Sequence, residues 1–224
     1  GKTVIVVDTP PDHREQVLSA NLDHIDAVLL THDHADHTHG IDDVRPTVIH
    51  MRRLMPVYMD QRTGQVVRRR FDYCFETPIG SDYPPITREM RITSGHVVEV
   101  DGPGGPIRVL PFDVHHGDID ALGFRFGGVA YTPDLHAIPE RSLAALTGLD
   151  LWIIDALRYS PHPSHFTVAQ ALEWIERMKP KHAILTNLHF DLDYEALKQQ
   201  LPSHVEPAYD GMTVRVEGTI PDHL

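Results

Sequence analysis

Short apolar runs recur along the chain, and most of them stop at an acidic residue, a glycine or a proline. Apolar runs of about four to eight residues are typical of buried strands, and apolar residues repeated every three or four positions are typical of helices. The predicted strands span residues 3–7, 26–30, 97–100, 107–114, 123–126, 129–132, 151–154 and 182–186. The predicted helices span residues 14–21, 40–46, 139–146, 168–178 and 194–201. The middle of the chain is rich in hairpins and the second half alternates strands with helices, which predicts a mixed α/β fold.

The stretch from about residue 47 to 95 interrupts this pattern. It contains a predicted turn at 60–64, a basic run at 68–70 and several aromatic residues and prolines. Insertions of this kind often build a pocket over a shared core, so we predict a segment that covers the substrate. Two simpler interpretations stay open. The basic run can be a solvated face, and the alternating aromatic residues of 71–75 can be ordinary strand packing.

Composition and charge narrow the class of protein. The chain has 224 residues, 41% hydrophobic and 23% charged, as expected for a soluble globular protein. We therefore predict a single domain over residues 1–224, with the segment at 47–95 as an insertion. The net charge of −12 argues against a long nucleic acid as partner, since such binding relies on Lys and Arg at the phosphates. A small anionic substrate at a local metal site remains compatible.

The same features bear on location. No apolar stretch approaches the roughly 20 residues of a membrane span. The single cysteine, Cys74, excludes an internal disulfide framework and a cysteine-based zinc site. We expect a cytoplasmic protein without membrane contact, and a homodimer stays open. Because the sequence starts at Gly1 without a methionine, the lack of a targeting signal counts little.

The most informative stretch is the histidine-rich segment that follows the strand at 26–30. His32 and His34 are two positions apart, so their side chains point the same way in an extended loop. If a helical turn starts near His34, Asp36 and His37 fall on its first turn and can face a second point. Imidazole and carboxylate ligands together suit Zn, Fe or Mn. The segment therefore predicts ligands for two adjacent metal ions, with a solvated histidine-rich loop as the alternative.

The pattern His-x-His-x-Asp-His after an apolar strand resembles the signature of the metallo-β-lactamase superfamily. Within it, the downstream order of strands, loops and helices is similar to that of the phosphoribosyl 1,2-cyclic phosphate phosphodiesterases of the carbon–phosphorus lyase pathway. The resemblance implies an αββα sandwich of two mixed sheets between helices, and two divalent ions, Zn or Mn. Members usually begin with one or two further strands, so we expect such strands to precede residue 1 in the full protein.

Downstream strand ends supply further candidate ligands. His115 and His116 face opposite sides of an extended strand, so only one of them should ligate. The family pattern implies His116, as a third imidazole beside His32 and His34. Asp134, which closes the strand at 129–132, matches the carboxylate that bridges the two metals.

The last ligand departs from the family pattern. In the nearest relatives the equivalent strand ends in Leu-Thr-His, whereas this chain has Asn187. His189 lies two residues on and can point to the same side, so we predict His189 as the ligand and Asn187 as a contact behind the ligands or to substrate. Asp8 and Asp155 each end a strand. We expect both to orient metal-bound histidines, because ligating imidazoles usually donate their other N–H to a carboxylate or a carbonyl.

The resemblance also implies the reaction. Two bridged metals would hold a hydroxide as nucleophile at neutral pH and clamp a phosphoryl oxygen. His165, in a loop before a helix, corresponds to a catalytic histidine and is the expected proton donor, with His162 as the fallback. Asp36 counts both as a ligand and among the catalytic residues.

Phosphodiester hydrolysis is the leading prediction, on a small cyclic or nucleotide phosphate. Asp36 beside His37 and the bridging Asp134 match the phosphodiesterase and thioesterase branches, and Cys74 lies far from the motifs, so β-lactamase activity is not expected. Candidate phosphate-binding residues are Arg45, Tyr73, Tyr83 and the basic run at 68–70. The alternatives are a lactonase or thioesterase with the same metals, and a non-hydrolytic accessory protein of a biosynthetic pathway.

Overall fold

The structure is a computed structural model in which residues 2–216 are described. It divides into two compact units, residues 1–107 and residues 108–224. They are called the first and the second unit below, and each is described by itself. The prediction of one domain with a substrate-covering insertion stays a prediction.

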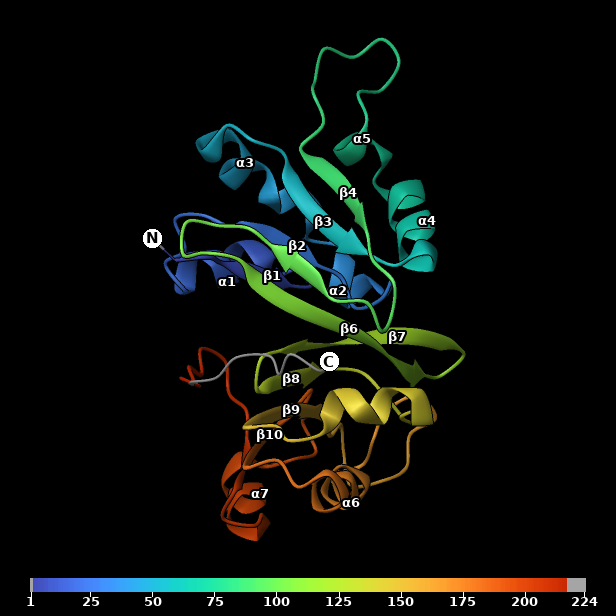
Figure 1. The fold of residues 1–224 in the computed structure, drawn as a ribbon, viewed down its shortest axis with the longest axis vertical. Helices are drawn as coiled ribbons and strands as arrows, with labels where there is room; N and C mark the ends of the chain where they lie inside the picture. The colour runs from blue at the N-terminus through green and yellow to red at the C-terminus, as the bar shows by residue number, and fades with distance from the viewer. Residues whose placement is uncertain (1, 217–224) are drawn as a thin grey trace. The chain divides into compact units, whose positions relative to one another are not determined.

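The first unit contains a four-stranded parallel sheet with the order β1-β2-β3-β4 (Figure 1). Its strands are β1 (Ile5–Val7), β2 (Ala27–Leu29), β3 (Met55–Met59) and β4 (Thr87–Arg91). Every residue of β2 and β3 is buried, whichever face it points to. Strands covered on both faces read as continuous apolar runs, which is why the segment before the histidine loop lacks polar alternation.

The helical segments of the first unit connect these strands. They are α1 (His13–Ser19), α2 (Ala35–Thr38), the 3₁₀ helix η1 (Ile41–Val44), α3 (Arg45–Met51), α4 (Gln61–Arg70) and α5 (Asp72–Phe75). One buried cluster joins apolar residues of β2 and β3 to residues of η1, α3, α4 and α5, including Val28, Val57, Ile41, Val67 and Cys74. This cluster fixes α4 and α5 on the sheet.

The secondary structure of residues 47–95 differs from the local predictions made from the sequence. It provides β3 and β4, so part of it belongs to the core sheet. The predicted turn at 60–64 is wrong. Asp60 is instead the N-cap of α4, where its side chain accepts a 2.7 Å hydrogen bond from the Thr63 backbone N–H. Strand packing at 71–75 is also wrong, because residues 72–75 form the short helix α5.

The second unit is built on a mixed sheet whose strands follow the order β11-β10-β9-β8-β7-β6. The strands are β6 (Ile107–His116), β7 (Ile119–Phe126), β8 (Val129–Thr132), β9 (Leu151–Asp155), β10 (His182–Thr186) and β11 (Val205–Pro207), while β5 (Val98–Val100) precedes them in the chain. β6, β7 and β8 pair antiparallel, and β8 to β11 pair parallel. The carboxyl ends of β8, β9 and β10 therefore share one edge of the sheet.

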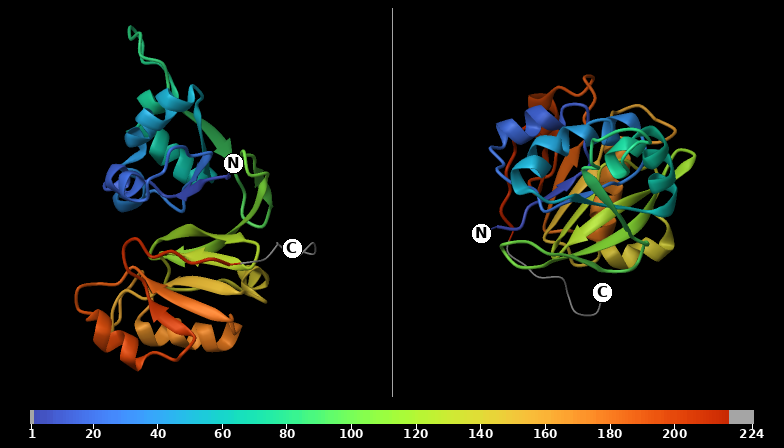
Figure 2. Two further views of the ribbon diagram at one scale, coloured as in Figure 1. Left: turned by 90° about the vertical axis from the view of Figure 1, so that its left-hand side faces the viewer. Right: turned by 90° about the horizontal axis from the view of Figure 1, so that it is seen from above.

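Two helices, α6 (Val168–Met178) and α7 (Tyr194–Gln200), lie on one face of this sheet (Figure 2), and the 3₁₀ helix η2 (Glu140–Leu146) lies between β8 and β9 in the chain. Thr167 caps α6 in a full capping box with Gln170. Trp152 of β9 is fully buried, and its indole N–H donates to the Thr132 hydroxyl at 3.0 Å. No helix within residues 2–216 combines the length and the apolar character that a membrane span requires.

Candidate metal centre

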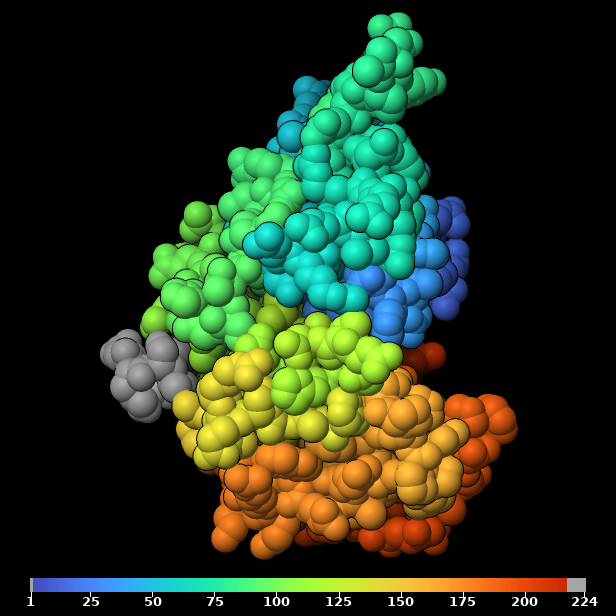
Figure 3. Space-filling model, turned by 90° about the vertical axis from the view of Figure 1, so that its right-hand side faces the viewer, coloured from blue at the N-terminus to red at the C-terminus, as the bar shows by residue number. Residues whose placement is uncertain are grey.

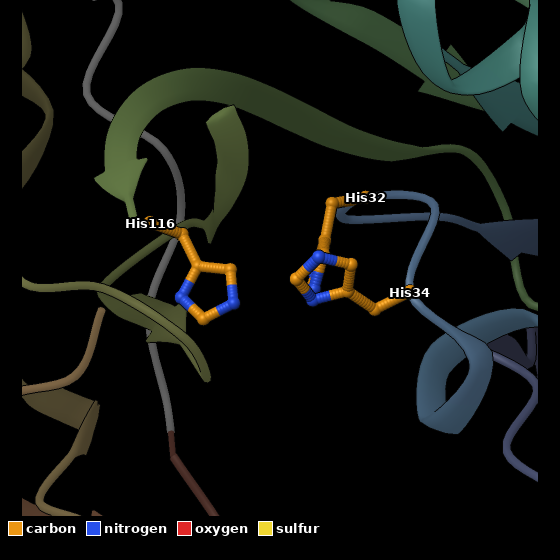
Figure 4. Close-up of side chains that lie close together, drawn as sticks. All are labelled: His32, His34 and His116. Carbon is orange, nitrogen blue, oxygen red and sulfur yellow. The ribbon is translucent and has the colours of Figure 1, made fainter. Parts of the chain in front are cut away.

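The loop after β2 carries the first candidate ligands. β2 delivers the chain to Thr31, after which His32 is fully buried and His34 is exposed. The two imidazole rings lie edge to face, with centroids 4.5 Å apart, and both come from this one loop (Figure 4). The His32 Nδ1 atom lies 2.9 Å from the Thr31 hydroxyl. Side chains two positions apart thus reach the same place, as the sequence pattern predicts.

Asp8 supports this loop from the end of β1. Its carboxylate accepts 2.8 Å hydrogen bonds from the Thr31 backbone N–H and the Thr31 hydroxyl, and it lies 2.7 Å from the His37 Nδ1 atom. Asp8 has a positive φ of 64°, a conformation in which few residues other than glycine are comfortable. Burial raises the pKa of Asp8, and the contact with His37 works against this rise. The Asp8 carboxylate thus orients the His37 ring.

Asp36 and His37 lie on the first turn of α2. The Asp36 side chain is exposed, and its Oδ2 atom lies 3.6 Å from the His37 Nε2 atom. The His37 ring centroid lies 4.2 Å from that of His32. Within residues 32–37, three imidazoles and one carboxylate are therefore gathered in a few ångströms.

Two arginines of α4 hold the residue between the two histidines of the motif. Asp33 is buried, and its Oδ1 atom lies 2.6 Å from the Arg62 Nη1 atom. Arg70 donates to the Asp33 backbone carbonyl and lies 3.7 Å from the Asp33 carboxylate. Sequence reasoning missed this clamp, because it predicted a turn at residues 60–64 where the structure has the helix α4 that carries both arginines.

A second group of candidate ligands lies in the second unit. His116 ends β6 (Figure 4), Asp134 follows β8, and His165 lies in the loop before α6. Their ligand atoms all lie within 4.8 Å of one another. The His116 Nε2 atom is 3.6 Å from the Asp134 Oδ2 atom, and the His165 Nε2 atom is 3.9 Å from it. His115, the neighbour of His116, instead contacts Asp120 at 2.5 Å.

Asp155 lies behind His165 at the end of β9. Its Oδ2 atom lies 2.8 Å from the His165 Nδ1 atom and accepts a 3.1 Å hydrogen bond from the Leu135 backbone N–H. Burial raises the pKa of Asp155 to about 6, against the opposing effect of His165. The carboxylate thus fixes the orientation of the His165 ring.

Asn187, rather than His189, lies beside these carboxylates. The Asn187 side-chain nitrogen lies 3.5 Å from Asp134, 3.4 Å from Asp155 and 3.3 Å from the His165 Nδ1 atom. Asn187 follows the last residue of β10 and has a φ of 60°, so the chain turns sharply where this strand ends. His189 contacts Asp191 at 3.2 Å, and its ring centroid is 4.0 Å from that of Phe190.

His162 lies next to His165 in the same loop. The ring centroids are 5.0 Å apart, and the His162 Nδ1 atom is 3.2 Å from the Ser164 hydroxyl. Partial burial lowers the pKa of His162, and the neighbouring His165 and Arg158 add to the effect. Both candidates for a proton donor therefore lie in one loop.

The residues predicted to bind phosphate come together elsewhere in the first unit. Arg45, Tyr73 and Tyr83 line one cavity of about 750 Å³, whose other walls are mostly apolar. Arg45 also pairs with Asp42 at 2.5 Å. The basic run is divided, since Arg68 pairs with Glu76 and Arg70 contacts Asp33.

Four histidines share an arrangement that fits divalent metal ions. In each one the Nδ1 atom faces a protein oxygen: His32 (Thr31 hydroxyl), His37 (Asp8), His116 (Ser164 carbonyl, 2.8 Å) and His165 (Asp155). Ligating histidines usually bind metal through one ring nitrogen and direct the other to such an oxygen. These rings are therefore oriented to bind through Nε2. Such ligands can hold an ion that polarises water or a phosphoryl oxygen.

Comparison with known families agrees with this geometry. The model of the family described as beta-lactamase superfamily domain matches residues 3–190. The predicted resemblance is confirmed, and so is the α/β fold with two sheets. The match also supports the prediction of a metal-dependent hydrolase.

Individual relatives extend the comparison. An octanoyltransferase of Porphyromonas gingivalis is 33% identical over 218 residues, which is 95% of this chain and 42% of that protein. A ribonuclease Z of a Bradyrhizobium species is 34% identical over 148 residues, which is 63% of this chain and 45% of that protein. The chain thus spans less than half the length of these relatives. A crystal structure described as a new diphosphatase from the PhnP family is 34% identical with a TM-score of 0.85, over 97% of this chain and 81% of that one.

Proposed function

Since the chain belongs to the beta-lactamase superfamily, we propose that it is a metal-dependent hydrolase that cleaves a phosphodiester bond in a small phosphate ester. The observation that carries the proposal is the shared arrangement of four histidines, each held at Nδ1 by a protein oxygen. The similarity to a PhnP-family diphosphatase and to a ribonuclease Z favours a phosphate ester over other substrates of the superfamily.

The proposed cofactor is a pair of divalent ions, Zn or Mn, held by the residues that the sequence predicts. These ligands are His32, His34, Asp36, His37, His116, Asp134 and His189. Bound there, the ions would lower the pKa of a water molecule and stabilise negative charge on the phosphoryl group. Asn187 is the alternative to His189, because its side chain lies within 3.5 Å of Asp134.

His165 is the proposed proton donor to the leaving oxygen. Asp155 holds its Nδ1 atom and stabilises the doubly protonated imidazolium, which can then release a proton from Nε2. The same Nε2 atom lies 3.9 Å from Asp134, a position from which it could also act as a ligand. Metal analysis of a His165 variant separates the two roles.

The direct test is hydrolysis of bis(p-nitrophenyl) phosphate by protein loaded with Zn or Mn, beside Asp134→Ala. We expect metal-dependent activity that falls by at least about 1,000-fold in the variant, since the loss of a shared ligand costs both metal binding and charge stabilisation. A metal-loaded wild type without activity would refute phosphodiester hydrolysis. Faster turnover of an uncharged lactone or thioester would select the ester hydrolase, and metal binding without hydrolysis would select the accessory protein.

A further inference from the structure

The cavity that brings Arg45, Tyr73 and Tyr83 together is separate from the proposed metal ligands. It measures about 750 Å³, a size that is usual for a small-molecule site. All of its lining residues fall within residues 45–86 of the first unit, and none of the proposed metal ligands is among them. The segment between α5 and β4 forms one wall and projects from the first unit, in blue-green at the top of Figure 3. The cavity is therefore a candidate binding site with a ligand of its own.

Most of the wall is apolar, and part of it is open to solvent. Val48 of α3 and Ile86 are buried, with only 8% and 3% of their surface exposed. Ile49 and Tyr83 are instead 68% and 77% exposed, although both are large apolar side chains. Large apolar groups that gather on a surface mark a binding site. The body of the ligand should therefore be apolar.

Three arginines line the cavity, and two of them are already neutralised. Arg45 pairs with Asp42 and Arg53 pairs with Asp26, each at 2.5 Å. Among the residues that the structure describes, the Arg52 side chain has neither a hydrogen bond nor an ion pair. No acidic residue of the described chain lines the cavity. One positive charge, that of Arg52, is thus left for a ligand.

This surplus of one charge selects the anion. A carboxylate carries a single negative charge, and its two oxygens can accept parallel N–H bonds from one guanidinium. A phosphate monoester carries about −1.5 to −2 at neutral pH, which exceeds the surplus. The buried part of the wall, Val48 and Ile86, is aliphatic and favours an alkyl chain over a flat ring.

We propose that this cavity binds a carboxylate with an alkyl chain, such as a medium-chain fatty acid. Arg52 holds the carboxylate, and Val48, Ile49 and Ile86 contact the chain. The inference does not depend on the proposed hydrolysis, since no proposed metal ligand takes part in it.

The test is calorimetric titration of the protein with sodium octanoate, beside octanamide, which has the same chain without the charge. We expect octanoate to bind at least about tenfold more tightly, the effect of one charge-assisted contact. From hexanoate to octanoate, each added methylene should tighten binding by about two- to fourfold, because it removes further apolar surface from water.

Arg52→Gly removes the guanidinium with little risk to the fold. Arg52 has a φ of 54°, a conformation that glycine adopts without strain, and circular dichroism checks that the variant is folded. This variant should bind octanoate as weakly as octanamide. Ile49→Ala should weaken both ligands about two- to fivefold and keep their ratio. Arg69→Ala, at an exposed arginine outside the cavity, is the matched control and should change neither affinity.

Three outcomes would overturn the proposal. Equal binding of octanoate and octanamide by the wild type, or a folded Arg52→Gly variant that keeps the preference, would refute the carboxylate contact. Octyl phosphate that binds more tightly than octanoate would make the cavity a phosphate site. A wild type that ignores octanoate and sediments as a dimer, with the dimer lost in Ile49→Asp, would assign the cavity to a second copy of the chain.

Discussion

The two groups of candidate ligands are built in different ways. In the first unit, His32, His34, Asp36 and His37 follow one another in a single loop and one helical turn. In the second unit, His116, Asp134 and His165 come from a strand end, a loop after a strand and a loop before a helix, more than 15 residues apart in sequence. Local backbone geometry is enough to gather the first group. The second group depends on the pairing of β6 to β10, and its precision is therefore a property of the whole sheet.

Both units nevertheless share one feature, a buried aspartate that holds a histidine in position. Each unit places one buried aspartate behind a histidine, Asp8 behind His37 and Asp155 behind His165, with Nδ1 distances of 2.7 and 2.8 Å. Both aspartates lie at the carboxyl end of a parallel strand, where the chain leaves the sheet. The ends of parallel strands are fixed by the sheet, so they are suited to hold a second residue in position.

The largest expected effect concerns the second group. We predict that His165→Ala lowers kcat on bis(p-nitrophenyl) phosphate by about 100- to 10,000-fold, the range for removal of a general acid. Metal content measured by mass spectrometry should stay at the wild-type value, because the role is proton transfer. His162→Ala is the control, and its kcat should fall by less than about tenfold. A loss of metal in His165→Ala would make this histidine a ligand, which would show that the second group completes its site through the loop before α6.

The next prediction compares substitutions of the two buried aspartates, Asp8 and Asp155. Asp8→Asn and Asp155→Asn keep the shape of the side chain and change the charge and the hydrogen-bonding of its histidine partner. Each should reduce metal affinity or activity by about 10- to 100-fold, as is usual for groups behind metal ligands. We expect Asp8→Asn to act mainly on metal affinity, since His37 is a proposed ligand. Asp155→Asn should act mainly on kcat through His165.

Titration with a metal-sensitive dye and steady-state kinetics separate these effects. If both variants lose metal affinity equally and keep the kcat of the reloaded enzyme, then Asp155 supports a ligand and not a proton donor. If neither variant changes either quantity, the shared feature has no functional role.

This contrast explains what could be predicted from the sequence. The loop at 32–37 was predictable because two rules, the period of two in extended chain and the first turn of a helix, act over neighbouring residues. The buried strands were predictable from continuous apolar runs. Strand alternation predicted that His115 and His116 face different sides, and the two rings do face different partners, whereas the choice of His116 came from the family resemblance.

What the sequence could not provide is set by tertiary contacts. The positive φ of Asn187 turns its side chain towards Asp134 and Asp155, whereas alternation alone favours His189. Residues 60–64 were predicted as a turn, whereas Asp60 caps the helix α4, whose residue Val67 packs into the core. The contacts of Arg62 and Arg70 with Asp33 join residues 29 and 37 positions apart, and no local pattern predicts them.

The smallest predicted effect uses probes that report the two units separately. Cys74, the only cysteine, is fully buried in the core of the first unit, and both tryptophans, Trp152 and Trp174, lie in the second. Burial raises the pKa of the Cys74 thiol to about 12, with Asp42 adding to the rise. The reactive form is the thiolate, so the folded first unit should protect Cys74 from 5,5′-dithiobis(2-nitrobenzoic acid) at pH 8.

The sign of the pH effect follows from the raised pKa. An unfolded thiol, with a pKa of about 8.5, loses its proton while the folded one keeps it, so ionisation favours the unfolded chain. The contribution to stability is intact below about pH 8.5 and decreases as the pH rises towards 12. In urea titrations followed by far-UV circular dichroism between pH 8 and 10, the wild type should therefore lose more stability than Cys74→Ala. Tryptophan fluorescence reports the second unit. If the two units unfold independently, this signal should show the same change of stability with pH for the wild type and for Cys74→Ala.

A labelling rate of Cys74 at pH 8 equal to that of the unfolded chain would mean that the core of the first unit opens freely. The ordered loop that it supports would then need metal to form.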